Sequence, residues 1–313
     1  MHSLEEELQE LRSAGAIDEA AAESAIAIEH RTVFCVFDEL RVALYGAVAL
    51  IVAGIGILVK DHLDRIGPLT LLFALAVAGA SCYVPAIRAK LRRTPRSTAG
   101  DYLLLLGALI VSADLGYAEL QFHWLGESWS RHLLFLTAVH AITAYLLDSR
   151  LVLSVALTTL AAWFGIERGP GTLNSWYASS PALGGRALLC AATLLAWRAI
   201  DQRRNSGRYR EVFEHFAANL AFWGVLSWCL DQHLRLVGVL ALLALAAVTI
   251  RTALRSEAES FAVYGVGYTA LGLTLAIVQT TDSLLLAATL VLGVVVASVA
   301  GLRYLHDRLK ERP

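Results

Sequence analysis

The sequence predicts an all-α polytopic integral membrane protein, a helical bundle with about ten transmembrane helices. Of its 313 residues, 57% are hydrophobic and only 17% are charged, whereas a soluble domain of this length carries about 25% charged residues. The mean hydropathy is +0.58. Apolar runs long enough to cross a bilayer recur from residue 41 onward. The distribution of Lys and Arg between these runs is the third observation.

The first 40 residues differ from the rest of the chain because they are acidic and polar. Ser3 and Glu6 have the spacing of a capping box, Gly15 ends the helix that they begin, and Asp18 begins another. We therefore expect residues 1–40 to form a cytoplasmic helical hairpin that offers a surface to a protein partner. The alternative is a solvated segment that only leads into the first membrane helix.

From residue 41 to the end, the chain forms the predicted transmembrane domain, 41–313. Its apolar segments alternate with short polar connections, and the fourth, fifth and eighth are short for a bilayer of about 30 Å, so they need flanking residues to cross. The ten segments lie near residues 42–59, 69–87, 102–120, 132–147, 151–166, 184–200, 216–231, 236–250, 261–280 and 284–302.

The positions of Lys and Arg support ten crossings. With the N-terminus inside, 20 of the 26 Lys and Arg residues fall in cytoplasmic segments and 6 fall in outer segments. The two densest clusters, "RAKLRRTPR" and "WRAIDQRRNSGRYR", both fall inside. This bias is what the positive-inside rule requires, and merging two short segments would destroy it. We therefore expect both termini on the cytoplasmic side. The excess of Arg over Lys, 23 to 3, is typical of a GC-rich bacterial genome, so we expect the bundle in a bacterial inner membrane.

A faint internal similarity indicates a repeat. "FDELRVALYGAVALIVAGIGI" and "LDSRLVLSVALTTLAAWFGI" lie about a hundred residues apart, and each precedes a Gly-Pro loop, an apolar segment and a basic cluster. This order predicts four-helix repeats near 41–148 and 149–252, with a closing pair at 261–302. Parallel repeats occur in transporters. The alternative is chance similarity between segments rich in Ala, Leu and Val.

Two ionisable residues lie inside the third and fourth apolar segments. Asp114 is near the middle of the third and His140 is inside the fourth. An ionisable group at this depth costs several kcal/mol unless it faces the bundle or water and has a partner. Asp114 and His140 are therefore candidates for an intramembrane proton- or ion-coupled site. The alternative for both is a structural side chain that is hydrogen-bonded to a neighbouring helix.

The third segment ends in "AELQFHWLGE", which adds polar groups where the chain leaves the membrane on its outer side. Glu119 and His123 are four residues apart and can pair on one helical face. Together with Gln121 they are candidates for a site at the outer mouth. The alternative is that these groups, with Trp124, only anchor the helix end at the membrane surface.

The composition and the motifs give no support to several classes of function, namely nucleic-acid binding, metal or cofactor binding, and catalysis. The net charge of −1 gives no indication of a nucleic-acid partner. None of the four cysteines forms a C-x-x-C pair, and no sequence has the spacing of metal ligands, so we expect no metal and no cofactor. No Ser-His-Asp, Walker or H-E-x-x-H arrangement is present. An enzyme therefore has no motif in its favour, although lipid chemistry stays open as a third alternative.

The N-terminal "LRSAGAID" turn, the Gly-rich first segment, the basic loop and the run "LLLLGALIVSADLGYAELQFHWLGE" resemble a known family. It is the bacterial domain-of-unknown-function 2157 family of predicted membrane proteins. The resemblance covers about residues 1–165. It implies a multi-pass inner-membrane protein and assigns no activity. The exit from the third segment, Gln121-Phe122-His123, is similar to the family's Gln-x-Tyr-His-like exit, with Phe for Tyr, which adds weight to Gln121 and His123.

The sequence therefore favours a transport-like or ligand-sensing membrane protein whose polar groups lie in the third and fourth helices. The competing hypothesis is a structural or scaffold membrane protein without a small-molecule site. The bilayer is the one partner that the composition demands. No substrate can be read from the residues.

Overall fold

The computed structural model describes residues 37–62, 67–92, 98–124, 129–165, 181–205, 207–256 and 258–310. In these ranges every regular element is an α-helix, which confirms the all-α prediction. The predicted N-terminal hairpin lies outside the described residues, so it stays a prediction.

Ten helices are described, one for each predicted apolar segment. They are α3 (Phe37–His62), α4 (Pro68–Leu91), α5 (Thr98–Phe122), α6 (Trp129–Leu147), α7 (Arg150–Gly165), α8 (Pro181–Asn205), α9 (Arg210–Leu230), α10 (Arg235–Ser256), α11 (Glu259–Thr280) and α12 (Leu284–Lys310).

Most of the helices extend beyond the segments predicted for them. The eighth segment, predicted as short, belongs to α10, which has 22 residues and is long enough to span. The fifth remains short, because α7 has 16 residues. At about 1.5 Å per residue, α7 is some 24 Å long, less than the hydrocarbon core of a typical bilayer.

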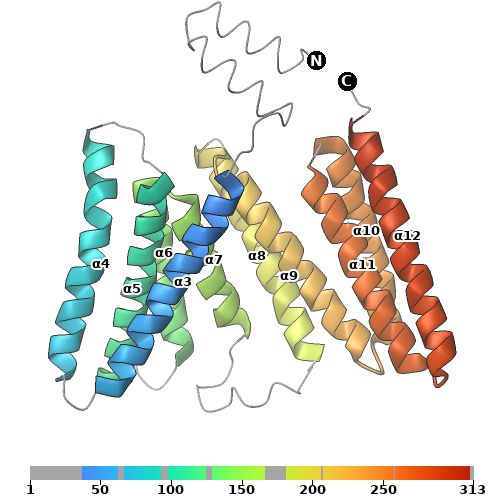
Figure 1. Ribbon diagram of the computed structural model, residues 1–313, viewed down its shortest axis with the longest axis horizontal. Helices are drawn as coiled ribbons and strands as arrows, with labels where there is room; N and C mark the ends of the chain where they lie inside the picture. The colour runs from blue at the N-terminus through green and yellow to red at the C-terminus, as the bar shows by residue number, and fades with distance from the viewer. Residues whose placement is uncertain are drawn as a thin grey trace, which may run out of the picture. The chain divides into compact units, whose positions relative to one another are not determined.

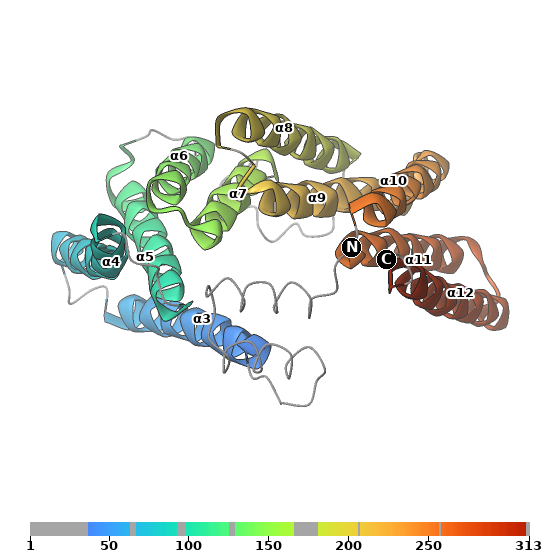
Figure 2. The same cartoon turned by 90° about the horizontal axis from the view of Figure 1, so that it is seen from above.

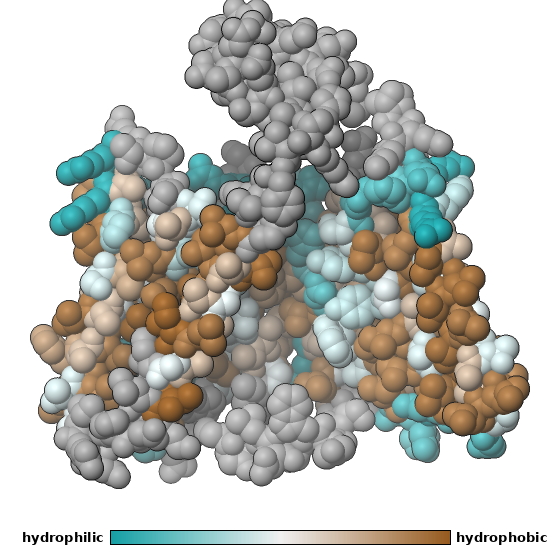
Figure 3. All heavy atoms as spheres, viewed as in Figure 1, coloured by the Kyte–Doolittle hydropathy of each residue, from teal (hydrophilic) through white to brown (hydrophobic). Residues whose placement is uncertain are grey.

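Six of the described helices are long and apolar enough to cross a membrane, namely α4, α5, α8, α10, α11 and α12. The most apolar is α12, and none of its membrane-length window is buried against other helices. Figure 3 shows hydrophobic side chains along the flank formed by α11 and α12, with hydrophilic residues at both ends. Exposed apolar surface of this extent is typical of a lipid-facing surface.

The chain divides into two units, residues 1–65 together with residue 313, and residues 66–312. Of the first unit only α3 is described as an element, and the second contains α4 to α12. Within the second unit, consecutive helices run antiparallel (Figure 1). The most extensive contacts join α4 with α5, α6 with α7, α8 with α9, and α10 with α11, so the unit is largely a row of helical hairpins (Figure 2).

The main core of this second unit lies where α5, α7, α8 and α9 meet. Leu104, Leu153, Leu157, Leu194 and Phe213 contribute fully buried side chains to it. Two smaller clusters join α9 to α10 and α11, and α10 to α11 and α12. The core therefore holds α5 to α9 most firmly, and both sites described below use these helices.

A tight turn links α6 to α7 and orients the side chain of Asp148. Asp148 has φ +52°, in the left-handed region that Asp and Asn tolerate better than other non-glycine residues. The Ser149 N–H donates to the Ala144 carbonyl over 3.0 Å, which completes a Schellman motif. Ser149 Oγ then accepts the Val152 N–H at the start of α7. The turn places Asp148 next to Lys90 at the end of α4 and Arg208 in the turn before α9.

Candidate functional site

Helix α5 carries polar groups on two different faces. On one face, a side chain at Gly107 would meet Cys82 and Tyr83 of α4. On the other, a side chain at Gly116 would meet His132 of α6. Ser112 and Glu119 lie four residues before and three after Gly116, so they share the face toward α6.

His140 is completely buried in α6 and is bonded to α5. Its Nε2 lies 2.7 Å from Ser112 Oγ. The Ser112 hydroxyl donates to the Ala108 carbonyl over 3.0 Å, so its oxygen accepts the proton carried by Nε2. Nδ1 of the same ring is buried and has no hydrogen-bond partner among the described residues. In the His140 ring, Nε2 thus donates a hydrogen bond, and Nδ1 can accept a proton.

Glu119 is also buried, with 3% of its surface exposed, and its charge acts on His132 of α6. His132 is 2% exposed. The two histidines are eight residues apart and therefore lie on nearly the same face of α6. The α5–α6 interface thus contains two polar pairs, Ser112 with His140 and Glu119 with His132, about two helical turns apart.

Asp114 does not belong to this interface. Seven residues separate it from Gly107, so it returns to the side of α5 that faces α4. Its side chain is partly buried, and Oδ1 is buried without a hydrogen-bond partner among the described residues. The hydroxyl of Tyr117, three residues further along α5, accepts a hydrogen bond of 3.4 Å from Gln121. The structure thus brings His140 to Ser112, and it places Asp114 on another face.

The two other residues of the predicted outer mouth are exposed. Gln121 makes only the bond to Tyr117 among the described contacts. His123 follows the end of α5 with φ +48°, and its N–H donates to the Glu119 carbonyl over 2.9 Å. Because His123 lies outside the helix and Glu119 is buried, the two side chains do not share one helical face, as their spacing of four residues had predicted. Glu119 faces His132 instead.

His132 and Ser112 are the residues that the sequence reasoning missed in this interface. A spacing of eight between two histidines on one predicted helix was a signal that both share a face. No comparable signal marked Ser112, because a serine in a helix more often bonds only to its own backbone.

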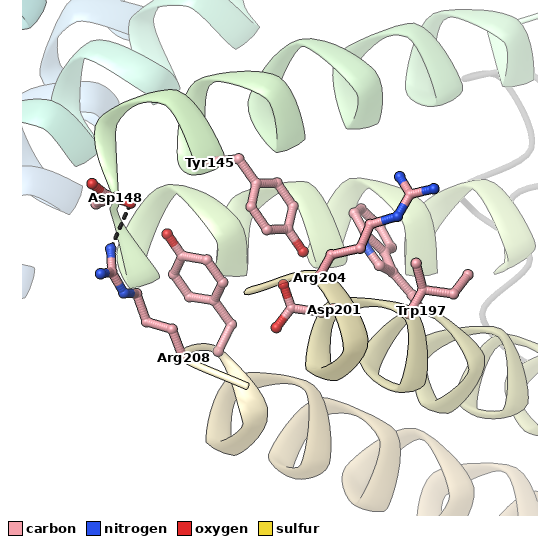
Figure 4. Close-up of a pocket in the computed structure, with 8 residues that line it drawn as sticks. Tyr145, Asp148, Trp197, Asp201, Arg204 and Arg208 are labelled. Atoms are coloured by element: carbon pink, nitrogen blue, oxygen red, sulfur yellow. Dashed lines mark ion pairs between the residues drawn. The ribbon is translucent and has the colours of Figure 1, made fainter. Parts of the chain in front are cut away.

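A second candidate site lies at the other ends of these helices and was not predicted. A cavity of about 720 Å³ lies between the C-terminal ends of α6 and α8 and the turn before α9 (Figure 4). Its lining combines aromatic and charged side chains: Tyr145, Asp148, Trp197, Ile200, Asp201, Arg204, Arg208 and Tyr209. No periodic pattern along the chain indicated this cavity, because it joins residues up to 64 positions apart.

Both carboxylates of this cavity have partners. Asp148 Oδ1 lies 2.7 Å from Arg208 Nη1, and its Oδ2 lies 3.9 Å from Lys90 Nζ at the end of α4. Asp201 is 3% exposed and is hydrogen-bonded to the Tyr145 side chain. In Figure 4, Tyr145 and Asp201 lie between the Asp148–Arg208 pair on one side and Arg204 on the other.

The aromatic wall of the cavity is held in place by its own contacts. Tyr209 is 2% exposed, and its hydroxyl donates to the Ala144 carbonyl over 3.3 Å. Burial, together with the nearby Asp148 carboxylate, raises the pKa of Tyr209, while Arg208 acts in the opposite direction. The hydroxyl therefore keeps its proton at neutral pH and can donate. Tyr145 packs edge-to-face on Tyr209 with ring centroids 5.2 Å apart.

In the ranges that the structure describes, no three His, Cys, Asp or Glu side chains gather closely enough to hold a metal ion. Three of the native cysteines, Cys82, Cys190 and Cys229, are buried free thiols. The chemistry that the two sites offer is thus proton exchange at the α5–α6 interface and recognition of a charged ligand in the cavity.

Comparison with known families gives one match. A family model described as "Predicted membrane protein (DUF2157)" matches residues 9–153, slightly less than half of the chain. This confirms the resemblance drawn from the sequence, and with the six apolar helices it identifies a membrane protein. The matched range contains the α5–α6 interface and ends within α7, before the cavity residues of α8. No curated protein and no solved structure matches the chain.

Proposed function

We propose that this is a multi-pass protein of a bacterial cytoplasmic membrane, with ten membrane-spanning helices and both termini in the cytoplasm. The alternation of helix direction from α4 to α12 supports an unbroken series of crossings (Figure 1). Helices α6, α7 and α9 are less apolar or shorter than the six candidate spans, but they pack directly against α5 and α8. Such neighbours shield a short or polar helix from lipid.

The proposed orientation of the protein in the membrane is supported by basic residues that gather at one end of the second unit. The last turn of α4 contains Arg88 and Lys90, and that of α8 contains Arg203 and Arg204. Lys90 and Arg208 both approach Asp148 in the α6–α7 turn, so the two basic clusters lie at the same end of the second unit. By the positive-inside rule, this end faces the cytoplasm.

The function that the geometry favours is transport-like or ligand-sensing, with a proton or ion handled at the α5–α6 interface. The observation that carries this proposal is the pair of buried histidines of α6, each facing a polar group of α5. Buried ionisable groups in membrane helices are costly and typically form proton relays or ion pathways. Glu119, with Gln121 and His123 near the end of α5, forms the outer entrance, and Asp114 is a further intramembrane carboxylate on the side of α4.

The chemical step is the binding and release of a proton. Nδ1 of His140 accepts the proton, which gives the imidazole a positive charge. An apolar interface stabilises this charge poorly, so either the proton leaves again or the interface rearranges. In the second pair, His132 is the group that exchanges the proton, and Glu119 is the acidic side chain that acts on it. Each event changes the interaction between α5 and α6, which links protonation to helix packing.

Cysteine accessibility tests this proposal. The four native cysteines are replaced, and single cysteines are introduced at positions 114, 119, 123 and 140 of the reconstituted protein. Because the proposed proton exchange requires the α5–α6 interface to open to water, we expect an impermeant thiol reagent added outside to label positions 119 and 140, which are buried in the closed interface, as well as the exposed position 123. A variant that retains only Cys190, which is fully buried, is the matched control and should stay unlabelled. Labelling at 123 alone would contradict the proposal and favour the scaffold alternative.

Proton uptake into liposomes separates transport from sensing. A potassium potential is imposed on liposomes that contain a pH-sensitive dye and the full chain. Transport predicts uptake faster than in protein-free liposomes, with a loss of about tenfold or more in His140→Asn. His215→Asn is the control, because His215 lies in α9 and stacks on Phe261, away from α6. Labelling at 119 and 140 without proton uptake would exclude proton transport and favour sensing.

A further inference from the structure

The geometry points to a second site that binds a phosphate group, in the cavity between α6, α8 and the turn before α9, with Arg204 as the residue that recognises the anion. This inference does not depend on the α5–α6 interface, which lies on other residues. The phosphate belongs either to a soluble organic phosphate or to an anionic lipid headgroup. The two sources share the same chemistry, and the experiment below separates them.

One arginine of the cavity lining makes no ion pair within the described part of the chain. Arg208 is neutralised by Asp148, and Asp201 is bonded to Tyr145. Arg204 lines the cavity and is exposed, and within the described part of the chain it makes no ion pair. The formal charges of the four charged lining residues, Asp148, Asp201, Arg204 and Arg208, cancel, and Lys90 beside Asp148 brings the local sum to +1. The hydrogen bond to the neutral Tyr145 leaves the formal charge of Asp201 in place, so the attraction of an anion depends on the guanidinium group of Arg204 and on Lys90.

The N–H donors of the two arginines suit the oxygens of a phosphate. A guanidinium group presents planar, parallel N–H donors that match two oxygens of a phosphate. Arg204 lies on one side of the cavity and Arg208 on the other (Figure 4). A phosphate bound by Arg204 therefore also lies in the field of Arg208, although the Asp148 partner reduces that contribution.

The cavity has the size of a small-ligand pocket, and part of its wall is apolar. A volume of about 720 Å³ lies within the range of roughly 300–1,000 Å³ that small-ligand pockets occupy. Trp197, Ile200 and Tyr209 give it an apolar side against which the organic part of a ligand packs. Trp197 is supported from behind by Phe213, with ring centroids 5.4 Å apart, and Tyr209 by Tyr145. The walls are formed before any ligand binds, which reduces the entropy cost of binding.

The location fits both sources of phosphate. The cavity lies at the ends of α6 and α8, beside the last turn of α8, which contains Arg203 and Arg204. Helix ends are at the depth of lipid headgroups in a membrane protein, and basic pockets at this depth bind anionic headgroups. The same position is open to soluble phosphates of the aqueous phase.

The test uses the full chain purified in an uncharged detergent, with two probes. Glycerol 3-phosphate is titrated by calorimetry, and phosphatidylglycerol is compared with phosphatidylcholine by native mass spectrometry. We expect at least one phosphate probe to bind and Arg204→Ala to weaken it about tenfold, the typical effect of a charge-assisted hydrogen bond. Arg203→Ala is the matched control, because Arg203 is exposed on the same helical turn and does not line the cavity.

The outcomes separate clearly. Binding of glycerol 3-phosphate that depends on Arg204 identifies a soluble phosphate. Preferential retention of phosphatidylglycerol that depends on Arg204, without glycerol 3-phosphate binding, identifies a headgroup. Equal weakening by Arg203→Ala and Arg204→Ala would show diffuse attraction to a basic surface and overturn the proposal. Absence of binding by both probes would overturn it as well.

A gain of affinity provides an independent check. Asp148→Asn removes a negative charge and leaves Arg208 without its partner, and Asn tolerates the left-handed backbone of this position. Phosphate binding should therefore become several-fold tighter in this variant. Weaker binding by a variant that keeps the wild-type unfolding temperature would contradict the proposed role of the two arginines.

Discussion

At the scale of single residues, one hydroxyl group decides how the buried imidazole of His140 is bonded. Ser112→Ala removes the partner of Nε2 and leaves both ring nitrogens of a fully buried side chain without a hydrogen bond. We expect the free energy of unfolding to fall by about 1–3 kcal/mol, measured by denaturation in mixed micelles.

Thr158→Ala is the control for Ser112→Ala. The Thr158 hydroxyl is exposed and bonds only to the Ser154 carbonyl of its own helix, so its removal should change stability by less than about 0.5 kcal/mol. If Ser112→Ala were equally mild, the bond between α5 and α6 would not be formed in the membrane protein.

Two adjacent glycines of α8 have opposite surroundings. A Cβ at Gly184 would lie 2.6 Å from the Gly224 carbonyl oxygen of α9, whereas a Cβ at Gly185 would have nothing within 4 Å. Gly184→Ala should therefore push α8 away from α9 and cost about 1–3 kcal/mol. Gly185→Ala should be neutral or stabilise by up to about 1 kcal/mol, since alanine favours a helix.

The thermal unfolding midpoints of these two variants in detergent test this difference. A similar decrease in both would mean that α8 and α9 do not approach each other this closely. Gly184 thus illustrates a residue whose importance depends wholly on the neighbouring helix.

At the scale of elements, Glu214 joins α8 to α9. Its Oε1 lies 2.6 Å from Arg198 Nη2 of α8 and 2.8 Å from Arg210 Nε of its own helix. The side chains of Glu214 and Arg198 are only 15% and 27% exposed. Glu214→Gln leaves Arg198 partly buried without its counter-charge, and we expect a loss of about 2 kcal/mol, less than for a fully buried pair.

Glu211→Gln in the same helix is the matched control. Glu211 pairs with Arg150 over 3.0 Å, but these side chains are 71% and 59% exposed. Water and salt screen this pair, so its loss should cost less than about 0.5 kcal/mol. Equal effects of the two variants in urea denaturation would contradict the role of Glu214 between the helices.

At the scale of the whole molecule, the ten-span topology predicts which positions face the outside of the cell. In a background without native cysteines, an impermeant thiol reagent added to intact cells should label Cys at 123, after α5, and at 282, before α12. Cys at 203 should react only after the cells are made permeable. Labelling of position 203 in intact cells would contradict the proposed orientation. Labelling at position 282 but not at position 123 would show that fewer helices cross the membrane before α12 than the ten-span topology requires.

Much of the architecture could be predicted from the chain alone. A helix in a membrane must satisfy its backbone within its own segment, so an apolar run both identifies the helix and locates it. This is why all ten predicted segments coincide with helices. The match to the family model over residues 9–153 was also foreseen from the residues of the same region.

The partners of the site residues were harder to predict. Periodicity shows which residues share a face of one helix, but it does not show which helix covers that face. Glu119 was therefore assigned to His123, four residues away, whereas the end of α5 and the packing of α6 bring it near His132. For the same reason, the sequence did not show that Asp114 faces α4 whereas Ser112 faces α6.

The sequence by itself determined that this is a helical membrane protein and the approximate position of each described helix along the chain, because the hydrophobic effect and backbone hydrogen bonding act locally along the chain. Tertiary structure alone decided that His140 bonds to Ser112 and that Tyr145, Asp201 and Arg208 surround one cavity. Those contacts join residues from different helices, and they exist only because the packing of one helix against another selects a rotation and a height that no local pattern encodes.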